Sequence, residues 1–440
     1  MTHSQDPRPF GPLRGVKVVS CSTAQAGTVP YMLMADLGAD VIKIEAPNGG
    51  DPSRRMTVLP GKGSTFFETN NRGVKSVTLN LKTPEGKAIL HRLVAKADIF
   101  GQNFRPGAAE KNGFGWEELR KINPKLVYVS ISGYGTKGPN GHLPGTDSMA
   151  QALGGIAEAY ATPGQRMKTG IASVADESTA MLAFGGALAA LTHARATGQG
   201  QKIELSLLGS LVRLLGWTFT TTMWRNQNPV TGQARITGTR ERPGISASFN
   251  DRDGKPLVFQ LTGPEDWKDA MSSLGFHERI AAAGFEDLGV IIDNDAKREE
   301  LLALLDGLFA TGTRDDWVAR LRGADIVSAP INTMLEASND PDVIANGHVT
   351  HVDHPRHGKL KVHGTPWQFS ATPVQVTRAP ALNEHHAEIV ASLASLRERV
   401  VVACFASNVA RLESTIDRLD SEVPPLTTST AACPCASTWV

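Results

Sequence analysis

The chain contains little cysteine and carries almost no net charge. Its four cysteines are spread unevenly over 440 residues, at Cys21, Cys404, Cys433 and Cys435. They are too few for a disulfide framework, which agrees with a reducing, cytoplasmic location. Lysine and arginine total 45 against 44 for aspartate and glutamate, so no overall charge drives the chain toward nucleic acid or an anionic membrane. A small-molecule partner is therefore expected.

Long apolar runs are also missing. The first ten residues lack the apolar stretch that a signal peptide requires. The longest apolar run, residues 178–192, is shorter than the ~20 residues needed to cross a bilayer, and it predicts a core helix instead. A hydrophobic fraction of 41% with charged residues at 20% is ordinary for a globular protein, and the length allows two domains.

Several cofactor and catalytic signatures are absent or incomplete. Neither a Walker-type phosphate loop nor a Gly-x-Ser-x-Gly nucleophile elbow occurs. Residues 133–138 fit the letters of the dinucleotide fingerprint, but the prolines and glycines that follow cannot open the required helix. His351, His354 and His357 match no recognised ligand spacing. Neither a nicotinamide cofactor nor a bound metal is predicted, and these histidines are expected on the surface or in loops.

Alternating strand and helix signals fill the first half of the chain. Strands are predicted over residues 16–20, 41–44, 76–81, 98–101, 126–132 and 202–206. Helical patterns lie between them, and one of these helices should begin with Thr83 as its cap and Pro84 at its first position. This alternation predicts an α/β fold with an open, Rossmann-like parallel sheet.

A change of composition after Trp224 predicts a second, smaller α+β domain. Residues 225–243 are polar and rich in Thr, Arg and Gly, and residues 249–254 mark a hairpin turn between two extended runs. Helices are expected near residues 265–274, 297–308 and 314–321. We therefore assign residues 1–224 to a large domain and residues 225–325 to a small one.

The most informative segment runs from Lys168 to Ala180, because it places Asp176 at the start of a helix of alanine, glycine and leucine. A carboxylate there lies against the partial positive charge of free backbone N–H groups, which suits a nucleophile. An acidic residue followed by Ser and Thr before an apolar helix is also typical of an ordinary N-cap. From this segment alone, the structural cap is the more common interpretation.

Three other segments favour a catalytic role for Asp176 over that of a structural cap. Residues 24–27 read Ala-Gln-Ala-Gly, residues 37–45 read Leu-Gly-Ala-Asp-Val-Ile-Lys-Ile-Glu, and residues 197–207 close the helix at Gly198 and lead into a strand. This combination resembles the class III CoA-transferases, the CaiB/BaiF family that includes formyl-CoA transferase, from about Leu13 to about Val390. The resemblance implies that the small domain is an insertion, that residues 326–398 return to the large domain, and that two chains form an interlocked dimer. Residues 399–440 extend beyond the usual family end as an atypical C-terminal extension.

The resemblance also implies an activity, which is transfer of coenzyme A from an acyl-CoA to a carboxylic acid through a covalent intermediate on Asp176. The carboxylate would form a mixed anhydride and then an aspartyl-CoA thioester, and the glycine-rich loop over residues 133–145 is a candidate source of oxyanion donors. Lys111 stands where many members carry Arg, although a solvated lysine is an equal alternative. The positions that the resemblance assigns to CoA contact are Ala24, Gln25, Ala26, Asn71, Arg72, Lys75, Asn103, Phe104, Lys111, Gly145 and Asp147.

Two departures from family patterns narrow the choice of reaction. The related racemases carry His before the Asp of a Gly-His-Asp segment, whereas this chain has Gly145-Thr146-Asp147, and a threonine hydroxyl lacks a pKa suited to taking an α-proton. The glycine-rich small-domain loop of formyl-CoA transferase is missing, which weakens oxalate and formate as substrates. The alternatives left are an acyl-CoA racemase or isomerase, and a CoA-binding protein without turnover.

Overall fold

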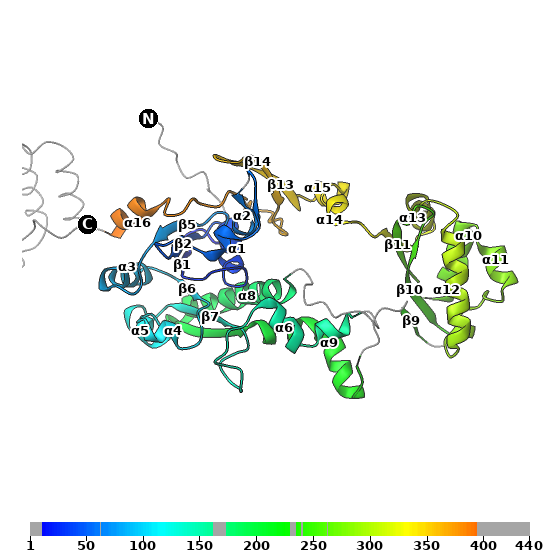
Figure 1. Cartoon of the computed structure of the whole chain (residues 1–440), viewed down its shortest axis with the longest axis horizontal. Helices are drawn as coiled ribbons and strands as arrows, with labels where there is room; N and C mark the ends of the chain where they lie inside the picture. The colour runs from blue at the N-terminus through cyan, green and yellow to red at the C-terminus, as the bar shows by residue number, and fades with distance from the viewer. Residues whose placement is uncertain are drawn as a thin grey trace, which may run out of the picture.

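The computed structural model describes residues 11–61, 63–161, 173–228, 235–238, 241–261 and 263–393. Figure 1 shows a large lobe built around a parallel sheet and a smaller lobe at the other end of the molecule. The start of the informative segment, residues 168–172, and the predicted extension over residues 399–440 lie outside the described residues.

Six parallel strands form the central sheet. They are β1 (Lys17–Ser20), β2 (Asp40–Glu45), β5 (Lys75–Thr78), β6 (Ile99–Gln102), β7 (Val127–Ser132) and β8 (Gln201–Ser206). Their order is β5-β2-β1-β6-β7-β8, and every pairing is parallel. The predicted α/β fold with an open parallel sheet is therefore confirmed. The order reverses between β1 and β6, and a crevice at the carboxyl ends of such strands is where ligands bind in folds of this kind.

Helices cover both faces of the sheet because successive strand residues point to opposite sides. Val18 and Val129 belong to one core, with residues of α1 (Val29–Asp36), α6 (Asp147–Leu153) and α8 (Val174–Thr197). Val19 and Tyr128 belong to the other core. Its helices are α3 (Pro84–Val94), α5 (Trp116–Ile122) and α16 (His386–Leu393).

Helix α8 carries Asp176 and packs through small residues. Ala183, Ala187, Ala190 and Ala194 recur at spacings of three and four and are buried on the sheet side. By length and composition α8 would also pass as a membrane-spanning helix, but a buried alanine face of this kind is that of a core helix, as predicted. Gly198 ends the helix with a left-handed φ of 75°.

The small lobe contains the second sheet, in the order β12-β11-β10-β9. Its strands are β9 (Arg235–Gly238), β10 (Pro243–Asn250), β11 (Pro256–Leu261) and β12 (Val327–Pro330), and the predicted turn joins β10 to β11. Residues of α10 (Pro264–Leu274), α11 (His277–Ala282), α12 (Asp295–Phe309) and α13 (Arg314–Gly323) share its core. Because β12 pairs with β11, this sheet continues to Pro330, beyond the expected boundary at residue 325.

The remaining elements complete the described chain. In the large lobe they are η1 (Pro52–Arg55), β3 (Val58–Leu59), β4 (Gly63–Ser64), α2 (Thr65–Asn70), α4 (Ala108–Lys111), α7 (Ile156–Ala159) and α9 (Leu207–Arg225). Later in the chain follow η2 (Leu288–Ile291), α14 (Met334–Ala337), α15 (Pro341–Ala345), β13 (Val349–His354) and β14 (Gly358–His363). The β13–β14 hairpin and α16 lie against the large lobe (Figure 1), where α16 contacts α3 and β5.

Candidate active site

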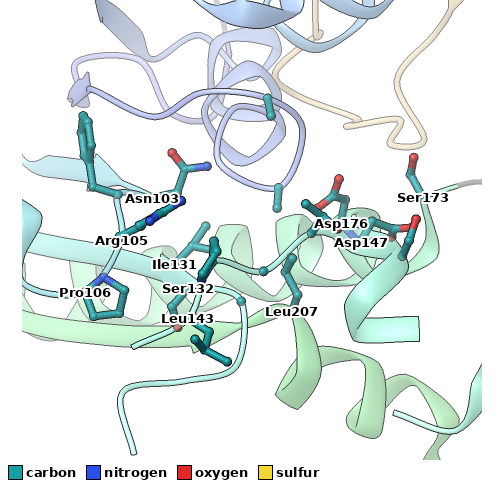
Figure 2. Close-up of a pocket in the computed structure, with 18 of the residues that line it drawn as sticks. Asn103, Arg105, Pro106, Ile131, Ser132, Leu143, Asp147, Ser173, Asp176 and Leu207 are labelled. Atoms are coloured by element: carbon teal, nitrogen blue, oxygen red, sulfur yellow. Dashed lines mark hydrogen bonds between the residues drawn. The ribbon is translucent and has the colours of Figure 1, made fainter. Parts of the chain in front are cut away.

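A cavity of about 670 Å³ opens beyond the carboxyl ends of β6 and β7. We call it the Asp176 cavity. Figure 2 shows Asp147, Ser173 and Asp176 on one side of it and Asn103, Arg105 and Pro106 on the other. Of the residues predicted to contact CoA, those that line this cavity are Ala24, Ala26, Asn103, Phe104, Gly145 and Asp147. The fold therefore brings these six together with the predicted nucleophile.

Asp176 lies in the first turn of α8. Burial, followed by the charges of Asp147 and Glu177, raises the pKa of its carboxyl from 3.8 to about 7. The expectation of free backbone N–H groups at this helix start is wrong. Oδ1 of Asp147 accepts hydrogen bonds from the backbone N–H of Ala175 at 2.8 Å and of Asp176 at 3.1 Å. The nucleophile candidate thus lies beside a second carboxylate rather than beside unpaired donors.

The cap on α8 comes from another helix because the local cap residue does not provide one. Ser173 has a left-handed φ of 52° and makes no side-chain capping bond. Asp147, at the start of α6, replaces it, and its Oδ2 accepts a hydrogen bond from Nε2 of Gln151 at 2.5 Å. Both oxygens of Asp147 are therefore engaged by the protein.

Gln25 forms the link between the β1–α1 loop and α8. Its Nε2 donates a hydrogen bond to Oε1 of Glu177. Asn103 holds the same loop in place, since its side chain exchanges two hydrogen bonds of 2.9 Å with the backbone of Thr23. Glu177 was not among the predicted site residues. The signal that could have found it is its position directly after Asp176.

The loop after β7 requires glycine at both of its ends. A Cβ on Gly133 would lie 2.5 Å from the Cα of Gly145, and a Cβ on Gly145 would lie equally close to Gly133. No real side chain fits such an approach, so the two glycines let the loop close on itself beside Asp147. No helix begins until α6 at Asp147, which agrees with the prediction that residues 133–138 do not form a dinucleotide-binding turn.

A second cavity, of about 340 Å³, lies at the end of β2, and Phe104 lines both cavities. We call it the β2 cavity. Lys43 and Asp51, which also line it, form a buried ion pair of 2.7 Å. Burial raises the pKa of the Cys21 thiol to about 12, so this residue of the lining is a neutral thiol.

Comparison with known proteins identifies the family. Residues 13–386 match CoA-transferase family III. The chain belongs to this family. It is 30% identical over 407 residues to the formyl-CoA:oxalate CoA-transferases of Shigella sonnei and Escherichia coli O6:H1, covering 87% of this chain and 95% of each relative. The family recognised in the sequence is therefore confirmed.

Solved structures agree with this assignment. A CAIB/BAIF family protein from Brucella suis has a TM-score of 0.77 at 30% identity, covering 88% of this chain and 100% of that one. Rv3272 from Mycobacterium tuberculosis has a TM-score of 0.73 at 28% identity, covering 86% of this chain and 99% of that one. This class III CoA-transferase is therefore an enzyme of a family that acts on CoA thioesters.

Gln25 lines neither of the two cavities of this class III CoA-transferase, and the same holds for four further residues predicted to contact CoA. Asn71 is buried and donates to the backbone oxygen of Phe67 at 3.2 Å. Arg72 is also buried and forms an ion pair of 2.6 Å with Asp36.

The other two of these four residues are lysines. Lys75 bridges Asp40 and Glu388 at 3.1 Å each. Lys111 is exposed at the end of α4. The charged side chains at and just before β5 thus form ion pairs with Asp36 of α1 and Glu388 of α16. No local sequence pattern indicated these contacts.

The histidines also differ from expectation, because His354 is buried beside His357 and Glu68. Nδ1 of His354 accepts a hydrogen bond from the backbone N–H of Arg356 at 3.2 Å, and Nε2 lies 3.7 Å from Glu68. Burial and the neighbouring positive groups lower the pKa of His354 to about 4. The neutral ring therefore carries its proton on Nε2, facing Glu68, which is the wrong tautomer for a metal ligand at that atom.

Proposed function

We propose that this class III CoA-transferase moves coenzyme A between two carboxylic acids, with Asp176 as the covalent nucleophile. One observation carries the proposal: the half-buried Asp176 lies in a cavity where Gly145, Asn103 and the β1–α1 loop also meet. That cavity shares Phe104 with the β2 cavity. A thioester held over Phe104 has one end near the carboxylate and the other end in a second cavity.

The chemistry begins with attack on the thioester. A carboxylate oxygen of Asp176 adds to the acyl carbonyl, the C–S bond breaks, and CoA leaves as a thiolate while a mixed anhydride remains on the protein. The thiolate then attacks the aspartyl carbonyl of that anhydride. The donor acid leaves as a carboxylate, and the protein holds an aspartyl-CoA thioester.

The second half repeats these steps in reverse with the acceptor. Its carboxylate displaces CoA from the aspartyl thioester to form a second mixed anhydride, and the released thiolate attacks the acceptor's acyl carbon. The new acyl-CoA leaves, and Asp176 regains its carboxylate. A thioester is exchanged for a thioester, so the sequence of steps balances without ATP.

The β2 cavity is our candidate for the nucleotide end of CoA. Its lining includes Cys21 and Thr23 after β1 and Phe104 after β6, the two strands between which the order reverses, and nucleotides bind at such a place in sheets of this kind. Phe104, 37% exposed, separates it from the Asp176 cavity, and its ring offers an apolar surface to the pantetheine arm.

We also propose that the chain acts as a homodimer in the cytoplasm. Helix α9 exposes Leu214, Trp217, Met223 and Trp224, of which Trp224 is 85% exposed. Met334 and Leu335 of α14 are 84% and 76% exposed. Exposed apolar residues gathered on one element mark protein–protein contact surfaces, and interlocking of two chains through the long connections between the lobes would cover them.

The racemase alternative is less well supported. Thr146 lines the Asp176 cavity at the position where the resembling racemases carry histidine. A threonine hydroxyl does not act as a base toward a carbon acid near neutral pH.

The proposal is tested by intact-protein mass spectrometry after mixing the protein with a panel of acyl-CoAs. The wild type is expected to gain an acyl or CoA adduct that hydroxylamine removes, and Asp176→Ala is expected to gain none. Asp353→Ala, which removes an exposed carboxyl on β13, is the matched control and should label as the wild type does. Binding of CoA without any adduct on the wild type would contradict the transferase mechanism.

A further inference from the structure

A third cavity, of about 440 Å³, lies between α1 and the first turns of α8. We call it the α1–α8 cavity. Its apolar lining comes from Val29, Met32 and Leu33 of α1, Met181 of α8, and Pro366. The three α1 residues are buried and form a core cluster with Ala180. The cavity therefore has a rigid apolar wall on the α1 side.

One pair of hydrogen-bonded side chains links the lining of this cavity to the lining of the Asp176 cavity. Ala24 and Ala26 line the Asp176 cavity, and Gln25 between them bonds to Glu177. Glu177 lines the α1–α8 cavity and directly follows Asp176 in the helix. We call these two side chains the Gln25–Glu177 barrier; both are unbranched, and such side chains change rotamer without movement of the backbone.

The charges around the barrier are of one sign. Asp147, Asp176 and Glu177 bring three carboxyl groups to the start of α8, and the first and last of them act electrostatically on Asp176. The described residues that line the α1–α8 cavity include no lysine or arginine, and of its two histidines, His348 and His363, the second has a pKa that burial and the charge of Arg72 lower. An acyl group that carried a second carboxylate would meet repulsion at this point, whereas an apolar chain would not.

We propose that the α1–α8 cavity receives the apolar chain of a monocarboxylic acyl group, and that Glu177 selects against acyl groups with a second carboxylate. This inference rests on the proposed function, because it assumes that the acyl carbon reaches Asp176. Each methylene buried in the cavity is expected to favour the reaction by about fourfold. The substrates are then aliphatic acids of several carbons, in contrast to the oxalate named in the relatives.

The test compares rates of adduct formation with acetyl-CoA, hexanoyl-CoA and succinyl-CoA. For the wild type we expect the second-order rate constant with hexanoyl-CoA to exceed that with acetyl-CoA by at least about tenfold, which burial of about two of the four additional methylenes supplies at about fourfold each. Succinyl-CoA is expected to be the slowest of the three. A wild type that reacts best with succinyl-CoA would overturn the inference.

Two variants test whether the preference among acyl groups depends on the α1–α8 cavity and on Glu177. Met181 is 43% exposed, so Met181→Trp can fill the cavity mouth without overpacking the core, and it should lower the hexanoyl-to-acetyl ratio by about tenfold or more. Glu177→Gln should raise the succinyl-to-hexanoyl ratio by about tenfold, because it removes one negative charge. The control Val290→Trp adds the same ring at an exposed position of the small lobe, outside the three cavities, and should leave both ratios unchanged.

The outcomes separate the inference from the proposed function. Unchanged ratios in both variants, with adducts still forming, would overturn the α1–α8 cavity as the acyl site and leave Asp176 as nucleophile. Failure of the wild type to form an adduct with any acyl-CoA, acetyl-CoA included, would overturn the proposed function itself.

Discussion

Asp176 has an environment that opposes its ionisation. Burial and the neighbouring Asp147 and Glu177 raise the pKa of its carboxyl to about 7, whereas nucleophilic attack requires the carboxylate. Under the proposed mechanism, the fraction of reactive enzyme therefore changes within the physiological pH range. Perturbed groups of this kind in a cavity are typical of functional sites.

Asp147→Asn is expected to shift the pH dependence of adduct formation to lower pH. In the wild type the rate should rise as the pH passes about 7, because Asp176 loses its proton there. Asparagine keeps an oxygen for the Ala175 and Asp176 N–H groups but removes the charge, so the pKa of Asp176 should fall. The midpoint is measured by single-turnover mass spectrometry between pH 5 and 9.

A control distinguishes charge from capping. Asp147→Ala removes the acceptor as well and should lower the free energy of unfolding by about 0.5–2 kcal/mol. An unchanged midpoint in the asparagine variant would show that Asp147 acts only as a cap.

Asp176→Asn is expected to stabilise the protein at alkaline pH. The folded pKa of about 7 lies above the reference value of 3.8, so the folded state holds a proton that the unfolded state releases between these values. The wild type therefore loses stability as the pH rises from about 4 to about 7, and the asparagine variant does not. We expect a gain of about 1–3 kcal/mol at pH 8 that disappears near pH 4. Denaturant unfolding at both pH values tests this, and an equal difference at both would contradict it.

The conformation of the loop after β7 depends on the glycines at its two ends, Gly133 and Gly145. Gly133→Ala places a Cβ 2.5 Å from Gly145, so the loop must open beside Asp147. Adduct formation should slow by at least about tenfold, and overpacking should cost about 1–3 kcal/mol of unfolding free energy. Kinetics and denaturant unfolding of the same preparation measure both effects.

Gly307→Ala is the matched control for this change. Gly307 lies within α12, and nothing occupies the space where its Cβ would be. Alanine there should raise the free energy of unfolding by about 0.5–1 kcal/mol and leave adduct formation unchanged. If Gly133→Ala behaves like this control, the close approach of the loop ends has no role in the site.

Most helices and strands were predictable because their signals are local. Thr83 caps α3 and Pro84 follows it, as the sequence predicted. The strands began and ended within a few residues of the expected positions, since period-two patterns and flanking Gly or Pro residues mark them. The expected end of the small domain fell short of β12 because antiparallel pairing with β11 carries no separate sequence signal.

At the scale of the whole molecule, the exposed apolar residues of α9 belong to the homodimer interface that we propose. Trp224→Asp should weaken a homodimer by at least about a hundredfold in dissociation constant, because charged residues are excluded from such interface centres. Analytical ultracentrifugation across a concentration series measures this. Val290→Asp changes another exposed apolar residue, on the small lobe, and should leave the dimer intact. A wild type that remains monomeric at every concentration would contradict the dimer.

The amino-acid sequence was sufficient for the α/β class, the parallel sheet, the helix that carries Asp176 and the family. Each of these depends on periodicity, caps and short segments, which neighbouring residues specify. The electrostatic environment of Asp176, in contrast, depends on residues that are far apart in the sequence. Asp147 lies 28 residues from the N–H of Ala175 that it caps, Gln25 lies 152 residues from Glu177, and Arg72 lies 36 from Asp36. The packing of helices and loops on the sheet determines which of these distant residues come into contact. No local sequence pattern specifies these contacts. The sequence predicted that Asp176 lies beside free backbone N–H groups at the start of α8. In the tertiary structure it lies beside the carboxyl groups of Asp147 and Glu177 instead.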